Sequence, residues 1–114
     1  MLDVYGIKNC DTVKKSLHWL HSNQVEVRFH DFKTESLSMA QVIGWAEQLG
    51  WDKLINRRGT TWRKLTDQQK ALSDDQALAE LVIANTSLIK RPLVEHHGVV
   101  MVGFDPEEWQ RGLL

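Results

Sequence analysis

The chain has 114 residues, of which 42% are hydrophobic and 25% are charged. These fractions are close to globular averages and exclude a disordered chain, and the length suits a single domain whose core needs no metal or disulfide support. Fourteen Lys and Arg against fifteen Asp and Glu give a net charge of −1, which argues against direct nucleic-acid binding. Because there is neither an apolar run of roughly 18 residues nor a signal peptide, we expect a cytoplasmic, monomeric protein that does not bind membranes.

The first thirty residues predict a strand, a helix and a second strand. Residues 2–5 are a short apolar segment that Gly6 ends. A helical pattern follows, with apolar residues at positions 13, 17 and 20 and Asn23 as its C-terminal stop. Apolar residues at 25, 27 and 29 then alternate with polar ones that include His30, which is the period of a strand. This order predicts a βαβ unit with a right-handed crossover.

The middle of the chain is predicted to be helical. Ser38 with Gln41 forms a capping box before one helix, which Gly50 ends. Ser73 and the glutamine three residues after it repeat the motif before a second helix. Between these helices, residues 52–66 carry Arg57, Arg58, Arg63 and Lys64 around Gly59 and predict short helical turns and loops.

The C-terminal part predicts two strands and a helix. Residues 88–95 and 99–102 are strand-like, and the turn between them indicates a hairpin. Asp105, followed by Pro106 and two glutamates, is typical of a helix start. We therefore expect an α/β fold with a four-stranded mixed sheet, in which the five tryptophans are packing residues partly exposed at helix edges.

Cys10 is the one cysteine of the chain, which excludes an internal disulfide and a cysteine-based zinc site. It lies at the start of the first predicted helix, where unpaired backbone N–H groups and the helix dipole favour the thiolate. Lysines at positions 8, 14 and 15 favour the thiolate as well, whereas Asp11 opposes it. The alternative is a buried, inert cysteine. Any disulfide that Cys10 forms must join it to a thiol of another molecule.

Two basic segments are candidate anion sites. Arg91 precedes Pro92 at the start of a predicted strand, which the expected sheet brings close to Cys10. There Arg91 can hold an anion or stabilise a thiolate, although a solvated arginine before a trans proline is the alternative. Arg57 and Arg58 can grip a carboxylate or a phosphate, with a solvated face as their alternative. The histidines are interpreted as surface residues, so no metal site is predicted.

Taken together, these motifs resemble the ArsC/Spx family of arsenate reductase-like proteins, most closely its YffB subgroup. The resemblance covers essentially the whole chain. It rests on Asn9-Cys10-Asp11-Thr12 at a helix start, on Arg57-Arg58 in a helical insertion, on Ile89-Lys90-Arg91-Pro92-Leu93 and on Val102-Gly103-Phe104. It implies a thioredoxin-like fold, with residues 1–34 and 86–114 as the core and residues 35–85 as an inserted helical subdomain. It also implies that Cys10 is the nucleophile, Arg91 the anion-binding arginine and Pro92 a cis-proline beside Cys10.

The chain departs from the family pattern at three positions. Spx-type regulators carry a second cysteine where this chain has Val13, so an internal redox switch is absent. The insertion arginine of arsenate reductases falls at Asn56, with Arg57 and Arg58 just beyond it. Their C-terminal arginine falls near Phe104, where this chain has none. We therefore expect weak or absent arsenate reduction, since an oxyanion loses a charge-assisted partner.

The function that the resemblance favours is that of a glutathione-dependent thiol reductase without a bound cofactor. Cys10 would form a mixed disulfide with glutathione as cosubstrate or with a substrate, and glutaredoxin or a protein thiol would be a further partner. The expected glutathione-binding residues are Asn9, Arg57, Arg58, Arg91 and Pro92. One alternative is an Spx-like regulator that binds RNA polymerase, because Gly50 aligns with a glycine that Spx uses for that contact. A second alternative is an arsenate reductase.

Overall fold

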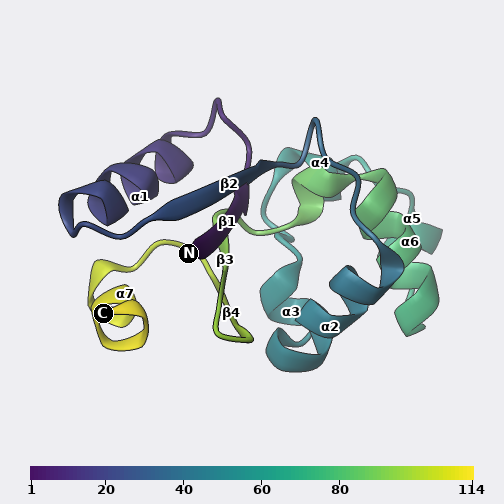
Figure 1. The fold of residues 1–114 in the computed structure, drawn as a ribbon. Helices are drawn as coiled ribbons and strands as arrows, with labels where there is room; N and C mark the ends of the chain where they lie inside the picture. Colours follow the sequence, from purple (N-terminus) through teal and green to yellow (C-terminus); the bar gives the residue numbers. More distant parts are fainter. The chain divides into compact units, whose positions relative to one another are not determined.

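Four strands form one mixed sheet in the order β2-β1-β3-β4 in the computed structural model, which describes residues 1–114 (Figure 1). β1 runs parallel to β2 and antiparallel to β3, and β3 and β4 form an antiparallel hairpin. The strands are β1 (Leu2–Gly6), β2 (Val27–Asp31), β3 (Leu93–His96) and β4 (Val99–Val102). The predicted four-stranded mixed sheet is therefore confirmed.

Seven α-helices and one 3₁₀ turn accompany the sheet. They are α1 (Asp11–Ser22), α2 (Met39–Leu49), α3 (Trp51–Leu54), α4 (Thr60–Arg63), α5 (Asp67–Lys70), α6 (Asp75–Ala84), η1 (Thr86–Leu88) and α7 (Pro106–Leu113). None of these helices is long and apolar enough to span a membrane. The chain divides into two units: residues 1–35 and 91–114 hold the sheet with α1 and α7, and residues 36–90 hold the other helices.

The core of the first unit lies between one face of the sheet and the helices α1 and α7. Leu2 and Val4 from β1 pack there with Val94 from β3, and Leu20 and Trp109 close the cluster from the two helices. Trp109 is only 1% exposed, and its indole N–H donates to the Gly103 carbonyl at 3.1 Å. Trp45 in α2 is buried too. The expectation that the five tryptophans are partly exposed is therefore wrong for Trp45 and Trp109, whose rings are buried.

Gly6 at the end of β1 sets how closely α1 approaches the sheet. A Cβ atom at this position would lie 2.8 Å from Cγ2 of Val13, a fully buried residue in the first turn of α1. Carbon atoms do not approach this closely without a shift of one of them. A glycine is therefore required here, and the contact fixes the start of α1 against the end of β1.

The second unit is built on two helices, α2 and α6, that pack against each other. Residues 54–56 and 88–90 run antiparallel beside them, joined by an isolated bridge between Ile55 and Ile89. The Asn56 N–H donates to the carbonyl of Leu88 at 2.7 Å, and the Lys90 N–H donates to the carbonyl of Leu54 at 2.9 Å. This pairing anchors the segment that carries Arg57 and Arg58.

Strand boundaries differ from the predicted ones at two places. β2 covers Val27–Asp31 rather than residues 25–30, and β3 begins at Leu93 rather than at residue 88. Residues 88 and 89 are fully buried because they join the core of the second unit, and an apolar run alone cannot distinguish that burial from a strand. The predicted hairpin is confirmed, and its turn has positive φ at both His97 and Gly98.

Helix starts follow the predicted caps with one exception. The Ser38–Gln41 capping box at α2 is confirmed, as is Asp105 before Pro106 at α7. The predicted box at Ser73 is wrong, because the N-cap of α6 is Asp74, whose carboxylate accepts from the Ala77 N–H at 3.0 Å. A carboxylate at this position also interacts favourably with the helix dipole.

Replacing Asp74 by alanine is expected to lower the free energy of unfolding by about 1 kcal/mol, since one N–H at the start of α6 loses its acceptor. Urea unfolding followed by circular dichroism measures the loss. Ser73→Ala is the matched control and should change the free energy of unfolding by no more than about 0.5 kcal/mol. Equal losses in the two variants would show that Ser73 contributes to the cap.

Candidate active site

Cys10 is the N-cap residue of α1, as the sequence predicts. Its backbone is extended, with φ −116° and ψ 122°, and its carbonyl accepts the first helical hydrogen bond from the Lys14 N–H at 3.0 Å. The residue is half-buried. The close contact between Gly6 and Val13 in the same turn holds this end of the helix in place.

Several groups act on the ionisation of Cys10. Burial is the largest single influence and raises the pKa of the thiol. Hydrogen bonds from the backbone N–H groups of Val13 and Thr12 lower the pKa, since these are the unpaired donors of the first turn. The Arg91 side chain lowers it further, both as a hydrogen-bond donor and through its charge. The net result is a pKa below the ordinary value, which favours the nucleophilic form of the sulfur.

Arg91 and Pro92 lie where the chain returns to the first unit, immediately before β3. The peptide bond between them is cis, which confirms the prediction drawn from the family resemblance. Pro92 is buried, and its carbonyl accepts a hydrogen bond from the Gly103 N–H at 2.9 Å. Anchored in this way, the start of β3 presents the Arg91 side chain to Cys10. The expected proximity of Arg91 to Cys10 is thereby confirmed.

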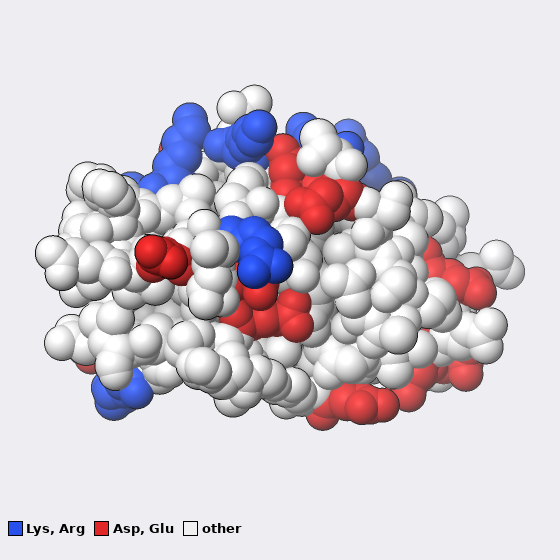
Figure 2. Space-filling view, in the orientation of Figure 1, with Lys and Arg blue, Asp and Glu red and all other residues white.

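Further polar residues surround the start of α1. Lys8, Lys14 and Lys15 are exposed, and Asn9 beside Cys10 is exposed as well. Figure 2 shows Lys and Arg side chains gathered over the part of the first unit where β1 leads into α1. Their positive charge favours an anionic ligand near this segment, although each lysine is screened by solvent.

Arg57 and Arg58 belong to the second unit, where they differ in their contacts. Together with Asn56 and Lys90 they line a cavity of about 410 Å³. The Arg57 guanidinium pairs with Asp52 and lies 5.3 Å from the centre of the Trp62 ring. The Arg58 side chain forms no ion pair, while its backbone N–H donates to the Asn56 side chain at 3.1 Å. Arg58 is therefore the more available of the two for an anion in this cavity.

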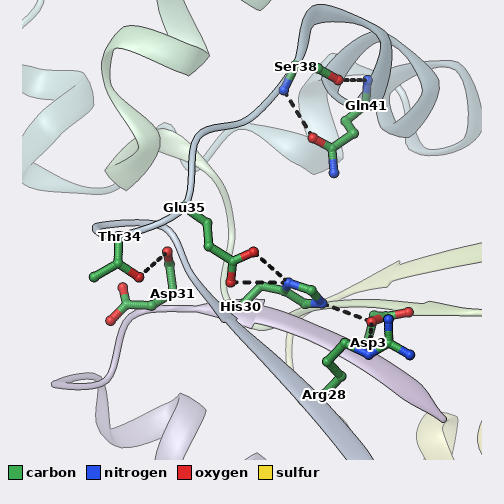
Figure 3. A network of polar contacts seen from close by, with 8 residues as sticks. All are labelled: Asp3, Arg28, His30, Asp31, Thr34, Glu35, Ser38 and Gln41. Atoms are coloured by element: carbon green, nitrogen blue, oxygen red, sulfur yellow. Dashed lines mark hydrogen bonds and ion pairs between the residues drawn. The ribbon is translucent and has the colours of Figure 1, made fainter.

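A third group of charged residues had not been predicted from the sequence. His30 on β2 lies between the carboxylates of Asp3 and Glu35, and Arg28 lies beside Asp3 (Figure 3). The sequence pattern places His30 only as a polar position of a strand. In the parallel register of β1 and β2, Tyr5 pairs with His30, so the two side chains lie next to each other. The periodicity of a single sequence does not specify this register, so it does not predict the group.

The mixed sheet, the helix that follows β1 and the cis-proline before β3 define a thioredoxin-like fold. The chain belongs to the ArsC family, whose model matches residues 5–111. It is 42% identical over 110 residues to an uncharacterized protein of Haemophilus influenzae, with 96% of each chain covered. A solved structure of a YffB protein superimposes with a TM-score of 0.94 at 40% identity, covering 100% of both chains. The global transcriptional regulator Spx of Listeria innocua is 27% identical, with 99% of this chain and 87% of Spx covered.

Replacing Arg91 by alanine is expected to raise the pKa of Cys10, since the thiolate loses both a donor and a nearby positive charge. The rate of iodoacetamide alkylation as a function of pH measures this pKa. In the unchanged protein the midpoint should lie below the roughly 8.5 of a free thiol.

Arg111→Ala, which removes an exposed charge from α7, is the matched control and should leave the midpoint in place. Arg91→Lys should restore part of the shift because it keeps the charge. A midpoint that is the same with and without Arg91 would contradict the role assigned to this side chain.

Proposed function

We propose that the protein is a glutathione-dependent thiol reductase in which Cys10 is the nucleophile. The Cys10 thiolate attacks the glutathione sulfur of a mixed disulfide, and the substrate leaves as its thiolate. A second glutathione thiolate then attacks the Cys10–glutathione disulfide, which releases oxidised glutathione and restores the Cys10 thiolate. In the overall reaction, one mixed disulfide of substrate and glutathione reacts with one glutathione to give the reduced substrate and one oxidised glutathione.

The single observation that carries the proposal is a lone cysteine whose pKa is lowered at a helix N-terminus. With no other cysteine in the chain, the Cys10 mixed disulfide has to be resolved by a thiol from outside. Glutathione is the abundant small thiol in reducing compartments, so it is the best-supported partner. Glutaredoxin or a protein thiol can take the same role.

Arg91 has two tasks in this proposal. Its guanidinium stabilises the Cys10 thiolate before the reaction and the leaving thiolate when the disulfide is resolved. The planar fork of its guanidinium is also suited to binding a glutathione carboxylate. Asn9, exposed beside Cys10, offers an amide for the peptide groups of the tripeptide. Pro92 fixes the backbone that carries Arg91.

That Arg57 and Arg58 hold a glutathione carboxylate stays a prediction. Arg58 is the stronger candidate because Arg57 already pairs with Asp52. An exposed arginine–carboxylate pair is worth only about 0–1 kcal/mol, so the affinity for glutathione should be modest and sensitive to salt.

A regulator of the Spx type is the second candidate, supported by the Spx relatives of this chain. Two residues argue for the reductase instead. Val13 takes the place of the second cysteine on which a redox switch depends, and it is fully buried. Gly50 joins the end of α2 to the start of α3 with φ +80°. This backbone conformation favours glycine by itself, so a contact with RNA polymerase is not needed to explain the residue.

Incubation with oxidised glutathione is expected to add one glutathione to the protein, since Cys10 is the one thiol that can exchange. Intact-mass spectrometry measures the adduct, and Cys10→Ser should abolish it. Arg91→Ala should slow adduct formation up to about fivefold, as expected for loss of a pair worth at most about 1 kcal/mol.

The controls are Arg58→Ala and Arg111→Ala. Slowing in Arg58→Ala would support the prediction for that arginine, while Arg111→Ala should react as the unchanged protein does. If no adduct forms in the unchanged protein but RNA polymerase is retained on an affinity column that carries it, the reductase proposal fails and the regulator takes its place.

Arsenate reduction is expected to be weak or absent, because neither Phe104 nor Asp105 can supply the third positive charge that an oxyanion needs. Arsenite release in the presence of glutathione and glutaredoxin measures the activity. Replacing Phe104 by arginine, with Phe104→Leu as the matched control, should increase it. Turnover by the unchanged protein at the level of a dedicated arsenate reductase would contradict the expectation.

A further inference from the structure

His30 is held between two carboxylates in the first unit. Its Nε2 lies 2.8 Å from Oδ1 of Asp3, and its Nδ1 lies 2.9 Å from Oε1 of Glu35 (Figure 3). The imidazole is largely buried, with 16% of the side chain exposed, whereas Glu35 is 49% exposed. Both ring nitrogens are therefore within hydrogen-bond distance of an oxygen that, when ionised, only accepts.

This arrangement decides the protonation state of the ring. A neutral imidazole has one N–H and can donate to only one of the two carboxylates, so two such hydrogen bonds require the imidazolium. A protonated carboxylic acid is the other way to satisfy the geometry. It is disfavoured near neutral pH because Glu35 is half-exposed and Arg28 lies 3.6 Å from Asp3.

The surroundings of the ring also favour a positive charge. The Tyr5 ring stacks on His30 with centroids 4.4 Å apart, a distance at which an aromatic face attracts a cation. Tyr5 donates a hydrogen bond to Glu95, and burial followed by this contact raises the pKa of the phenol far above its ordinary value. The groups around His30 are thus Asp3, Glu35, Arg28 and, through Tyr5, Glu95.

Glu35 closes a turn and is also the last residue of the first unit, since the chain enters the second unit at residue 36. Within the turn, the N–H groups of Thr34 and Glu35 donate to the Asp31 carbonyl at 3.1 and 2.9 Å. The Lys33 N–H donates to the Asp31 carboxylate at 2.9 Å. The middle of the turn is tied to β1 by the buried Phe32, whose N–H donates to the Gly6 carbonyl at 2.9 Å. His30 links the end of the turn, at Glu35, to Asp3 of β1.

We propose that His30 is a pH-dependent clasp: as an imidazolium it joins Glu35 to Asp3 of β1 through two hydrogen bonds. Loss of its proton removes one of these two hydrogen bonds and so loosens the end of the 31–35 turn, at the residue that leads into the second unit. The device is independent of the chemistry at Cys10. The contact that holds Glu35, the last residue of the first unit, becomes weaker as the pH rises.

The direction of the pH response follows from the contacts. Burial lowers the pKa of His30, but the hydrogen bonds and charges of Asp3 and Glu35 raise it by more, so that the net pKa lies above the ordinary value. A raised pKa means that the clasp contributes its full stability below about pH 6.5 and loses it as the pH rises through the pKa of the folded protein. His30 therefore holds Glu35 and Asp3 together at acidic pH, and this contact weakens at alkaline pH.

The test is an NMR titration of the ring nitrogens of His30 in the full chain. Both nitrogens should carry a proton at pH 6, with a midpoint above the roughly 6.5 of free imidazole. Glu35→Gln should lower that midpoint, because it removes one negative charge from the pair. Glu47→Gln, which removes the charge of an exposed glutamate in α2, is the matched control and should leave the midpoint unchanged.

Hydrogen exchange of the turn supplies the conformational readout. The protection of the Lys33, Thr34 and Glu35 amides, measured relative to the unfolded chain at the same pH, should fall as His30 loses its proton. In Glu35→Gln this fall should be smaller or shifted to lower pH. Three results would each overturn the proposal. They are a His30 midpoint at or below about 6.5, a midpoint that Glu35→Gln does not change, and amide protection that stays constant while His30 titrates.

Discussion

The unpaired N–H groups at the start of α1 are the feature on which the candidate site depends. They oppose the burial of Cys10, which by itself would keep the thiol protonated, and the Arg91 side chain adds to their effect. The position of these groups follows from backbone packing. Gly6 lets Val13 approach the end of β1, and this close approach fixes the first turn of α1 against the sheet. The position of the helix start is thus one cause of the lowered pKa of Cys10.

Both connections between the two units border a charged group. The first leaves after Glu35, which His30 holds, and the second returns at Arg91, which contacts Cys10. In each case a cation meets a titratable anion: an imidazolium with two carboxylates, and a guanidinium with a thiolate. Protonation of the histidine or of the thiol therefore changes contacts where the chain crosses from one unit to the other.

Local sequence signals predict much of the fold and the centre of the site. The cap of α2, the hairpin at His97 and Gly98 and the N-cap position of Cys10 all depend on neighbouring residues, and each was predictable. Features that depend on tertiary contacts were not. Leu88 and Ile89 read as strand residues but pack in the second unit, and His30 gained its role from a register that periodicity does not specify.

The most direct test of the central claim is a single turnover with a glutathionylated peptide. Rapid mixing of the reduced protein with this peptide, followed by acid quench and intact-mass spectrometry, should show a Cys10–glutathione disulfide that forms as the peptide is released. Added glutathione should then remove it and regenerate the free thiol. Release of the peptide at the same rate in Cys10→Ser, or attachment of the peptide rather than glutathione to Cys10, would contradict the proposed reaction.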